Sequence, residues 1–177
     1  LWGKTTYLHG SCDVPLVLRL PPSVSDARPG LEIDTPILTA DLHPTLLELA
    51  GLEPSPDSDG LSLLPAIRAG EGNRDRLVCG EYGDATNASA FATDGCFKYV
   101  YYSKGGIEHL FDLAADPENL HNLARDPAQA HVKADLRRRL IDYLAGFNRP
   151  LVQDGELIAV NPTLDKASLY SRNPWAW

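Results

Sequence analysis

A lysine and a histidine close to the N-terminus are the side chains best suited to chemistry. Lys4 follows Gly3 in a short polar stretch, and His9 comes five residues later. A lysine ammonium is a compact positive charge with three hydrogen-bond donors, so it can bind an anion and stabilise negative charge that develops on it during a reaction. We therefore take Lys4 as the candidate catalytic and substrate-binding residue and His9 as a second candidate for substrate binding. The alternative for Lys4 is an exposed surface lysine without a partner.

An apolar run directly after this stretch is the element that would position Lys4. The residues 14–20 read VPLVLRL and are bounded by Pro15, Pro21 and Pro22. An apolar run of this length between prolines is typical of a strand that is buried on both faces of a parallel sheet. The sequence thus predicts a buried strand over residues 14–20, with neighbouring strands on both sides.

The whole stretch resembles a segment of the type I sulfatases, which belong to the alkaline-phosphatase-like superfamily. Those enzymes carry the pattern G-K-x-T-x-Y-E-G-S-x-R-V-P-L, followed by an apolar residue and R-x-P, just after a metal-binding Asp-His-Gly. The matching residues are Gly3, Lys4, Thr6, Gly10, Ser11, Val14, Pro15, Leu16 and Arg19. Three residues depart from the pattern, since Leu8, His9 and Asp13 stand where it has Tyr, Glu and Arg.

Three further blocks match the same family in the same order. They are residues 41–51 (DLHPTLLELAG), residues 59–65 (DGLSLLP), and residues 110–113 (LFDL) with 116–119 (DPEN) and 122–124 (NLA). Together the four blocks cover about residues 1–147. The resemblance implies that the chain is the C-terminal portion of a sulfatase, with an α/β fold in which a mostly parallel sheet domain ends and a small antiparallel sheet follows.

The resemblance also implies a reaction, and it implies which catalytic groups belong to this chain and which to an upstream portion. The parent enzyme is expected to hydrolyse a sulfate ester of a small molecule or glycan, and the lysine matching Lys4 contacts the sulfate. The calcium ion and the formylglycine nucleophile are expected in an N-terminal catalytic portion upstream, so this chain alone should hold neither and be inactive. Cys12 is not the nucleophile, because it lacks the family's Cys/Ser-x-Pro-x-Arg context. The alternatives are a phosphonate monoester or phosphodiester hydrolase of the same superfamily and a non-catalytic interaction module.

Composition and charge exclude some classes of binding partner. The chain has 177 residues and a net charge of -8, which argues against a nucleic-acid or anionic-membrane partner. It contains no apolar run of the roughly 18 residues that a membrane span needs, so we expect a soluble cytoplasmic or periplasmic protein. Its three cysteines are an odd number without metal-site spacing, and we expect free thiols. Because it begins with Leu1 and lacks methionine, we expect a C-terminal piece of a longer protein.

The pattern of apolar residues and turns predicts three regions. Residues 1–73 should end the catalytic α/β domain and include a packing helix from Thr39 or Asp41 to Gly51 and a short helix over 61–67. Residues 74–150 should form a meander of four antiparallel strands over 77–82, 90–93, 97–103 and 107–113, because Asp-Gly and Gly-Gly pairs favour tight hairpins. A helix capped by Asp126 and Pro127 should cover this sheet. Residues 151–177 should be a docking tail, which binds either the catalytic domain or a second subunit as a homo-oligomer.

Two polar groups in the second region have both a structural and a functional interpretation. Arg137, Arg138 and Arg139 lie on the outer face of the predicted helix and are expected to be solvated rather than to bind an anion. The turn at 116–122 is expected to bond its own backbone. The alternative is a calcium site made of Asp112, Asp116 and Glu118, which is not expected.

Overall fold

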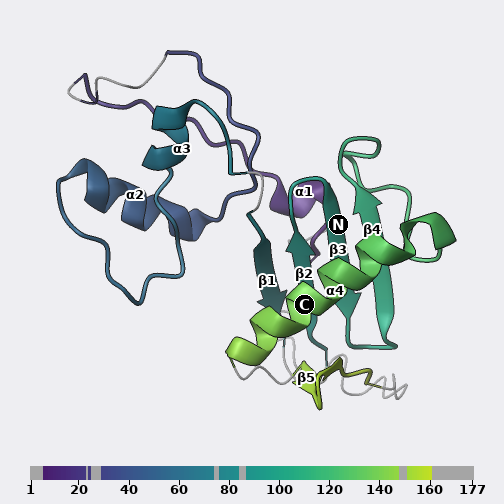
Figure 1. The fold of residues 1–177 in the computed structure, drawn as a ribbon. Helices are drawn as coiled ribbons and strands as arrows, with labels where there is room; N and C mark the ends of the chain where they lie inside the picture. The colour runs from purple at the N-terminus through teal and green to yellow at the C-terminus, as the bar shows by residue number, and fades with distance from the viewer. Residues whose placement is uncertain are drawn as a thin grey trace, which may run out of the picture.

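The computed structural model describes residues 6–22, 24, 29–73, 76–83, 87–147 and 151–160. Figure 1 shows two parts, a helical lobe and a sheet covered by a long helix. The lobe lies within residues 14–73, and the sheet begins just after it. This mixed α/β architecture, with a small antiparallel sheet and a C-terminal helix, confirms the predicted fold class. None of the helices in the described residues is long and apolar enough to cross a lipid bilayer.

The sheet is an antiparallel meander in the order β1-β2-β3-β4. Its strands are β1 (Val78–Tyr82), β2 (Ser89–Thr93), β3 (Phe97–Tyr102) and β4 (Ile107–Asp112). Each strand begins and ends within one residue of its predicted bounds. The strand bounds could be predicted because glycines mark the hairpin turns. Gly95 and Gly105 have φ angles of 87° and 84°, a region that residues with side chains disfavour.

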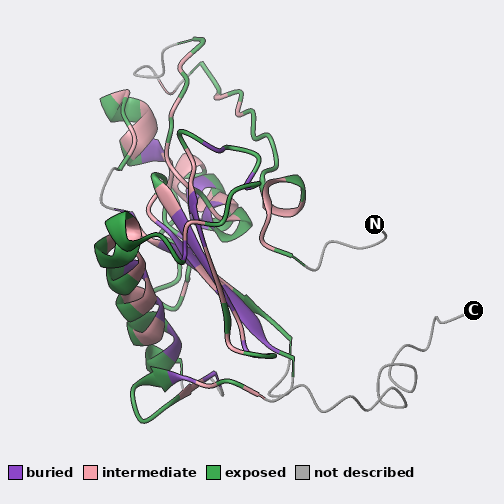
Figure 2. Ribbon diagram, turned by 90° about the vertical axis from the view of Figure 1, so that its right-hand side faces the viewer, coloured by how far each residue is buried: buried purple, intermediate pink, exposed green. Residues whose placement is uncertain are grey.

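The main core lies between this sheet and helix α4 (Ala130–Gly146). Figure 2 shows α4 along one side of the sheet with buried residues between them. The helix follows a short 3-10 turn, η2 (Pro127–Gln129), and the Asp126 side chain accepts a hydrogen bond from the Ala128 N–H, as predicted for the cap. The core is formed by Ala90, Ala92, Tyr99, Tyr101, Leu110, Leu136, Leu140 and Leu144.

The arginines on the outer side of α4 make ion pairs with acidic neighbours. Arg138 is exposed and lies 2.8 Å from Asp135 and 3.0 Å from Asp142. Arg137 reaches off the helix to Glu156 at 2.7 Å. These contacts agree with a solvated, charged helix face.

The first ten residues of the predicted tail, 151–160, pack on the four-stranded sheet of the same chain. They form a two-stranded hairpin of β5 (Val152–Gln153) and β6 (Glu156–Leu157). Leu151 and Leu157 are buried in the main core, and the Val160 N–H donates to the Ser103 carbonyl at 2.7 Å. The remainder of the tail, from residue 161, lies outside the described residues, so homo-oligomer formation through it stays a prediction.

The helical lobe contains η1 (Thr39–Asp41), α2 (Leu42–Leu49) and α3 (Leu64–Ala69). Helix α2 and the turn before it agree with the predicted helix. Helix α3 begins three residues after the predicted start of the short helix at 61 and ends two residues after its predicted end at 67. The expectation that this helix packs through its apolar residues was wrong at Leu46, which is 59% exposed. Pro44 and Thr45 are the buried residues of this helix instead.

A buried polar network holds the lobe together and joins it to β1. The Asp41 carboxylate is fully buried and accepts hydrogen bonds from the N–H groups of Leu38 and Leu61. Arg76, just before β1, donates to both oxygens of Asp41 at 2.8 Å. Burial raises the pKa of Asp41, but these hydrogen bonds and the arginine charge outweigh it and hold that pKa below its usual value. The Asp41 carboxylate thus links the block 41–51, to which it belongs, to the block 59–65, which contains Leu61.

The predicted buried strand over residues 14–20 is absent, which corrects the prediction made from its apolar run. The segment belongs to neither sheet, and its side chains are largely exposed, with Val14 at 65% and Val17 at 91%. A strand buried in a parallel sheet takes both its hydrogen bonds and its packing from neighbouring strands. Among the described residues no strand runs beside this segment, so it stays irregular.

Candidate functional site

The structure cannot place the first candidate residue, because Lys4 lies outside the described residues. The description begins two residues later, at Thr6. The site is therefore built from the segment that directly follows Lys4 and from the surface on which this segment lies.

This segment packs on the face of the sheet that points away from α4. The Tyr7 ring lies 4.6 Å from the Phe91 ring, and its hydroxyl donates to the Ser89 carbonyl at 3.3 Å. Burial raises the pKa of Tyr7 well above its usual value. Phe91 and Ser89 are on β2, so residues 6–8 are held against the middle of the meander.

His9 begins the one-turn helix α1 (His9–Cys12) and has carboxylates at both ring nitrogens. Its Nδ1 contacts the Asp13 carboxylate, and its Nε2 lies 3.9 Å from Glu118. Positions 9 and 13 are two of those at which this chain departs from the sulfatase pattern, which has Glu and Arg there. The chain therefore keeps an i,i+4 pair at these positions with the polarity reversed.

A buried lysine that the sequence analysis did not select lies beside this pair. Lys98 is on β3 and is only 4% exposed. Its Nζ donates to the Asn119 side-chain oxygen at 2.9 Å and to the Tyr7 carbonyl at 3.2 Å, and it lies 3.9 Å from Asp13. The available signal was the strand alternation, which put Lys98 on the same face as Val100 and Tyr102, where a lysine needs a partner.

The turn at 116–122 supplies the Asn119 partner and bonds its own backbone, as predicted. The Asp116 carboxylate accepts hydrogen bonds from the N–H groups of Leu120 and His121, at 3.0 and 2.7 Å, which lower the pKa of Asp116. Asn119 has a φ of 58° and is buried. Across the described part of the chain, no group of three or more His, Cys, Asp or Glu side chains is placed to hold a metal ion, and this includes Asp112, Asp116 and Glu118.

The same sheet face carries a half-buried histidine among aromatic rings. His109 lies 5.3 Å from the Tyr102 ring and 5.7 Å from the Phe111 ring. Burial lowers the pKa of His109, which favours its neutral form. The face is thus mostly apolar around the buried Lys98 ammonium.

None of the three cysteines, which all lie in the described ranges, forms a disulfide, in agreement with the expected thiols. Cys79 is buried, and burial raises its pKa to about 12. Because the thiolate is the reactive form, Cys79 is a poor nucleophile. Cys96 is exposed, and Cys12 is partly exposed on α1.

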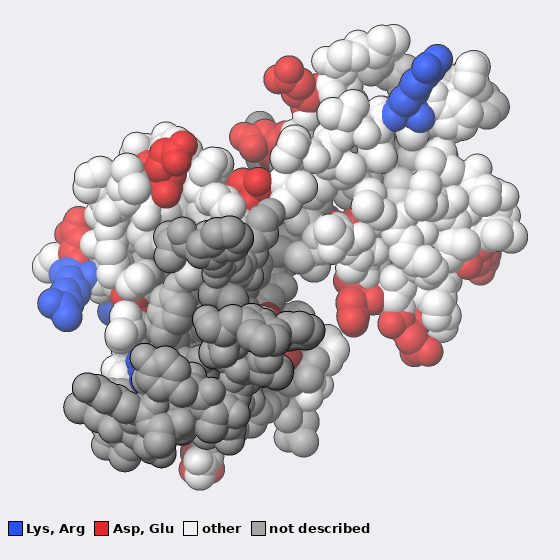
Figure 3. All heavy atoms as spheres, turned by 180° about the vertical axis from the view of Figure 1, so that it is seen from behind, with Lys and Arg blue, Asp and Glu red and all other residues white. Residues whose placement is uncertain are grey.

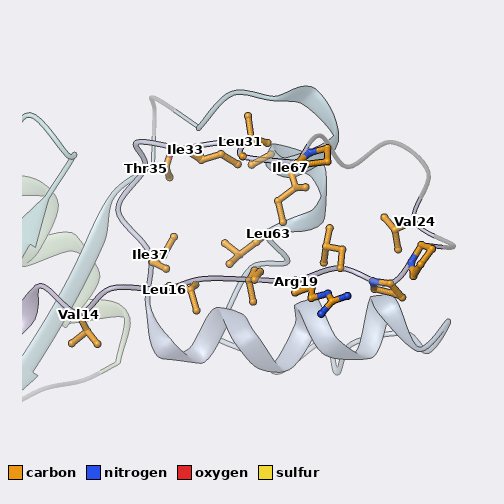
Figure 4. A pocket seen from close by; sticks show the side chains of 17 residues that line it. Val14, Leu16, Arg19, Val24, Leu31, Ile33, Thr35, Ile37, Leu63 and Ile67 are labelled. Atoms are coloured by element: carbon orange, nitrogen blue, oxygen red, sulfur yellow. The ribbon is translucent and has the colours of Figure 1, made fainter.

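An apolar groove lies in the helical lobe, away from Lys98. It has a volume of about 770 Å³ and runs between the segment 14–22, the segment 29–37 and the start of α3. Figure 4 shows Leu16, Ile37 and Leu63 around the space between these segments. Val14 and Leu16, whose predicted strand is absent, form part of the lining.

Comparison with known proteins agrees with this architecture. The family described as N-sulphoglucosamine sulphohydrolase, C-terminal, matches residues 1–145. The choline-sulfatase of Rhizobium meliloti (strain 1021) is 41% identical over 122 residues, which are 66% of this chain and 22% of that protein. Arylsulfatase K of Xenopus laevis is 31% identical over 153 residues, which are 79% of this chain and 28% of that protein.

A solved structure shows the same fold. The structure of a 2-O GAG sulfatase superposes with a TM-score of 0.53 at 30% identity, and the match covers 61% of this chain and 24% of the other. The sheet and its covering helix are therefore those of sulfatases with the alkaline-phosphatase-like fold. The chain belongs to the type I sulfatase family and corresponds to its C-terminal portion. It spans about a quarter of the length of the relatives it matches.

Proposed function

We propose that this chain is the C-terminal part of an enzyme that hydrolyses sulfate monoesters, and that it contributes Lys4 to the substrate site. The family match over residues 1–145 carries this proposal, because it includes Lys4 within the segment that resembles the family's sulfate-binding lysine. His9, five residues later, is the second substrate-binding candidate of the same segment. Its two carboxylate contacts orient its ring in the absence of substrate.

The chemistry needs the positive charge that Lys4 would supply. Cleavage of a sulfate ester moves negative charge onto the leaving oxygen, while the sulfuryl oxygens remain negative. A fixed ammonium that contacts these oxygens stabilises the transition state. Removing one such donor in an enzyme typically lowers kcat by about 10²–10³-fold.

The nucleophile and metal of this proposal lie outside the chain. A calcium site is built from several oxygen ligands, and the described residues contain no cluster of acidic or histidine side chains that could form one. We therefore assign the calcium and the formylglycine to the portion of the enzyme that this chain does not contain. On this proposal the chain alone is inactive.

The surface of the helical lobe supports a partner of that kind. Val14, Val17, Leu46 and Leu61 are all more than half exposed, and the apolar groove lies in the same lobe. Figure 3 shows that the lobe, at the upper right of this view, has a broad uncharged surface with few basic residues. Such an apolar surface is typical of an interface. We propose that the catalytic portion covers it.

The test is Lys4→Ala in the full-length enzyme, with Lys104→Ala as the matched control. Lys104 is an exposed lysine at the turn between β3 and β4. We expect kcat for an aryl sulfate to fall by about 10²–10³-fold in Lys4→Ala, with an unchanged melting temperature, and to stay at the wild-type value in the control. Wild-type turnover by Lys4→Ala would remove Lys4 from the site.

A substrate panel tests the reaction class. Choline sulfate, an aryl sulfate, a 2-O-sulfated glycosaminoglycan oligosaccharide and an aryl phosphonate monoester would be compared by kcat/KM. We expect a sulfate ester to give the highest value. A preference for the phosphonate would assign the enzyme to the phosphonate monoester hydrolases instead.

A further inference from the structure

We propose that Lys98 is a positioning residue for the sulfatase reaction, since its buried ammonium anchors the segment that continues into Lys4. The proposal rests on the function proposed above, in which Lys4 contacts the sulfate. Lys98 itself would not touch the substrate, because its side chain is enclosed and its Nζ already has two hydrogen-bond acceptors.

The ammonium joins three parts of the chain that are distant in sequence. It lies on β3, bonds the Tyr7 carbonyl in the N-terminal segment, and bonds Asn119 in the turn after β4. Asp13, at the end of α1, is the nearest carboxylate, at 3.9 Å. The segment from Tyr7 to Asp13 is therefore attached to Lys98 at both of its ends.

Loss of these contacts would cost free energy, so the N-terminal segment is held firmly against Lys98. A buried ammonium without acceptors is strongly unfavourable, so displacement of the N-terminal segment would leave Lys98 with too few partners. The Tyr7 ring also packs on Phe91, and its hydroxyl donates to the Ser89 carbonyl, but both contacts hold the side chain. Lys98 instead hydrogen-bonds the Tyr7 backbone itself.

The distance to Lys4 makes this attachment relevant to catalysis. Tyr7 lies three positions after Lys4 in the sequence, a span of at most roughly 10 Å of extended chain. A displacement of about 1 Å at a reacting centre can lower a rate by about 10²-fold. Lys98 therefore holds the chain only three positions from the proposed sulfate-binding lysine.

The reversed pair at positions 9 and 13 fits this arrangement. With Asp13 at the end of α1, a negative charge faces Lys98, and His9 contacts the same carboxylate. The arginine of the family pattern would place a second cation beside the buried ammonium. The departure from the pattern therefore makes the junction electrostatically favourable in this chain.

The experiment uses the full-length enzyme with Lys98→Met, which keeps the length of the side chain and removes its charge. The matched control is Lys133→Met, since Lys133 pairs with Glu108 between α4 and β4. For Lys98→Met we expect kcat to fall by about 10–100-fold with little change in KM. We also expect faster amide hydrogen exchange in residues 6–13. The control should match the wild type in both measurements.

A double variant separates positioning from a general loss of structure. If Lys98 acts through Lys4, then Lys98→Met should cause no further loss of kcat in a Lys4→Ala background. An equal loss in both backgrounds would mean that Lys98 only stabilises the fold and would overturn the proposal. Wild-type kcat and wild-type exchange in Lys98→Met would also overturn it.

A failure of the proposed function would look different. In that case Lys4→Ala would keep wild-type turnover, whereas exchange in residues 6–13 of Lys98→Met would still report whether Lys98 anchors the segment. If Lys98→Met does not fold, Asn119→Gly replaces it. Asn119 has a φ of 58°, which glycine adopts readily, so this variant removes one acceptor of Lys98 without backbone strain. We expect a smaller loss of kcat and faster exchange, and wild-type behaviour would overturn the proposal.

Discussion

At the scale of single residues, Asp41 combines complete burial with a full set of hydrogen bonds. Its carboxylate receives two backbone N–H groups and both bonds from Arg76. Removing one partner of a buried ion pair leaves the other charge unpaired, which typically costs about 3–5 kcal/mol. We expect Asp41→Ala to lower the free energy of unfolding by about that amount in urea titrations, whereas Asp57→Ala, at an exposed carboxylate, should have no effect. A loss below about 1 kcal/mol in Asp41→Ala would contradict this account.

The same residue predicts a dependence on pH. The pKa of Asp41 is lower in the folded chain than its ordinary value of 3.8. A depressed pKa contributes stability that is complete above the unfolded-state pKa and is lost as the pH falls through the folded-state pKa. We expect the melting temperature to fall below about pH 4, with a smaller fall in Asp41→Asn. Asp116, whose pKa is also lowered, contributes to the remaining decline. An identical decline in wild type and variant would exclude Asp41 as a cause.

The residue scale also shows what the sequence could not reveal. Residue alternation along β3 puts Lys98 on the face opposite Tyr99 and Tyr101, but its partners Tyr7 and Asn119 are 91 and 21 residues away. No local pattern connects positions so far apart. His9 was selected from the sequence, and the structure shows it between Asp13 and Glu118, while its contact with substrate stays a prediction.

At the scale of elements, α4 depends on three leucines that are buried against the sheet. Leu140 is fully buried in the core, and truncation of such a side chain typically costs about 2–5 kcal/mol because a cavity remains. We expect Leu140→Ala to lower the free energy of unfolding by this amount. Leu120→Ala, at a side chain that is 74% exposed, should change it little. Equal effects of the two variants would mean that α4 does not pack as described.

Elements were predictable where their signal is local. The four strands and their hairpins follow from alternation and glycine positions, and α4 follows from its cap and leucine spacing. The predictions that segment 14–20 and the apolar residues of α2 are buried were wrong for the same reason. Both were predicted to be buried because they are apolar, but burial also depends on packing partners, which the function proposed above assigns to the catalytic portion.

At the scale of the whole molecule, the exposed apolar surface predicts different behaviour in the isolated chain and in the full-length enzyme. Val17 is 91% exposed here, so Val17→Asp should leave the melting temperature of the isolated chain unchanged. In the full-length enzyme the same change should destabilise the protein by about 1.5–3 kcal/mol or more, because Val17 would then be buried. Thermal unfolding of both proteins measures this. Equal melting temperatures of variant and wild type in the full-length enzyme would show that Val17 is not part of the interface.

The attachment of residues 6–13 to the sheet has a consequence for the order of folding. Tyr7 meets Ser89 and Lys98 across 82 and 91 residues of chain, whereas each hairpin of the meander closes a short loop. Closure entropy favours the short loops first. During synthesis the N-terminal segment leaves the ribosome long before β2 and β3. Its contacts with these strands can therefore form only later. Residues 6–13 can therefore complete their contacts with Lys98 and Glu118 only after translation has passed the turn at 116–122.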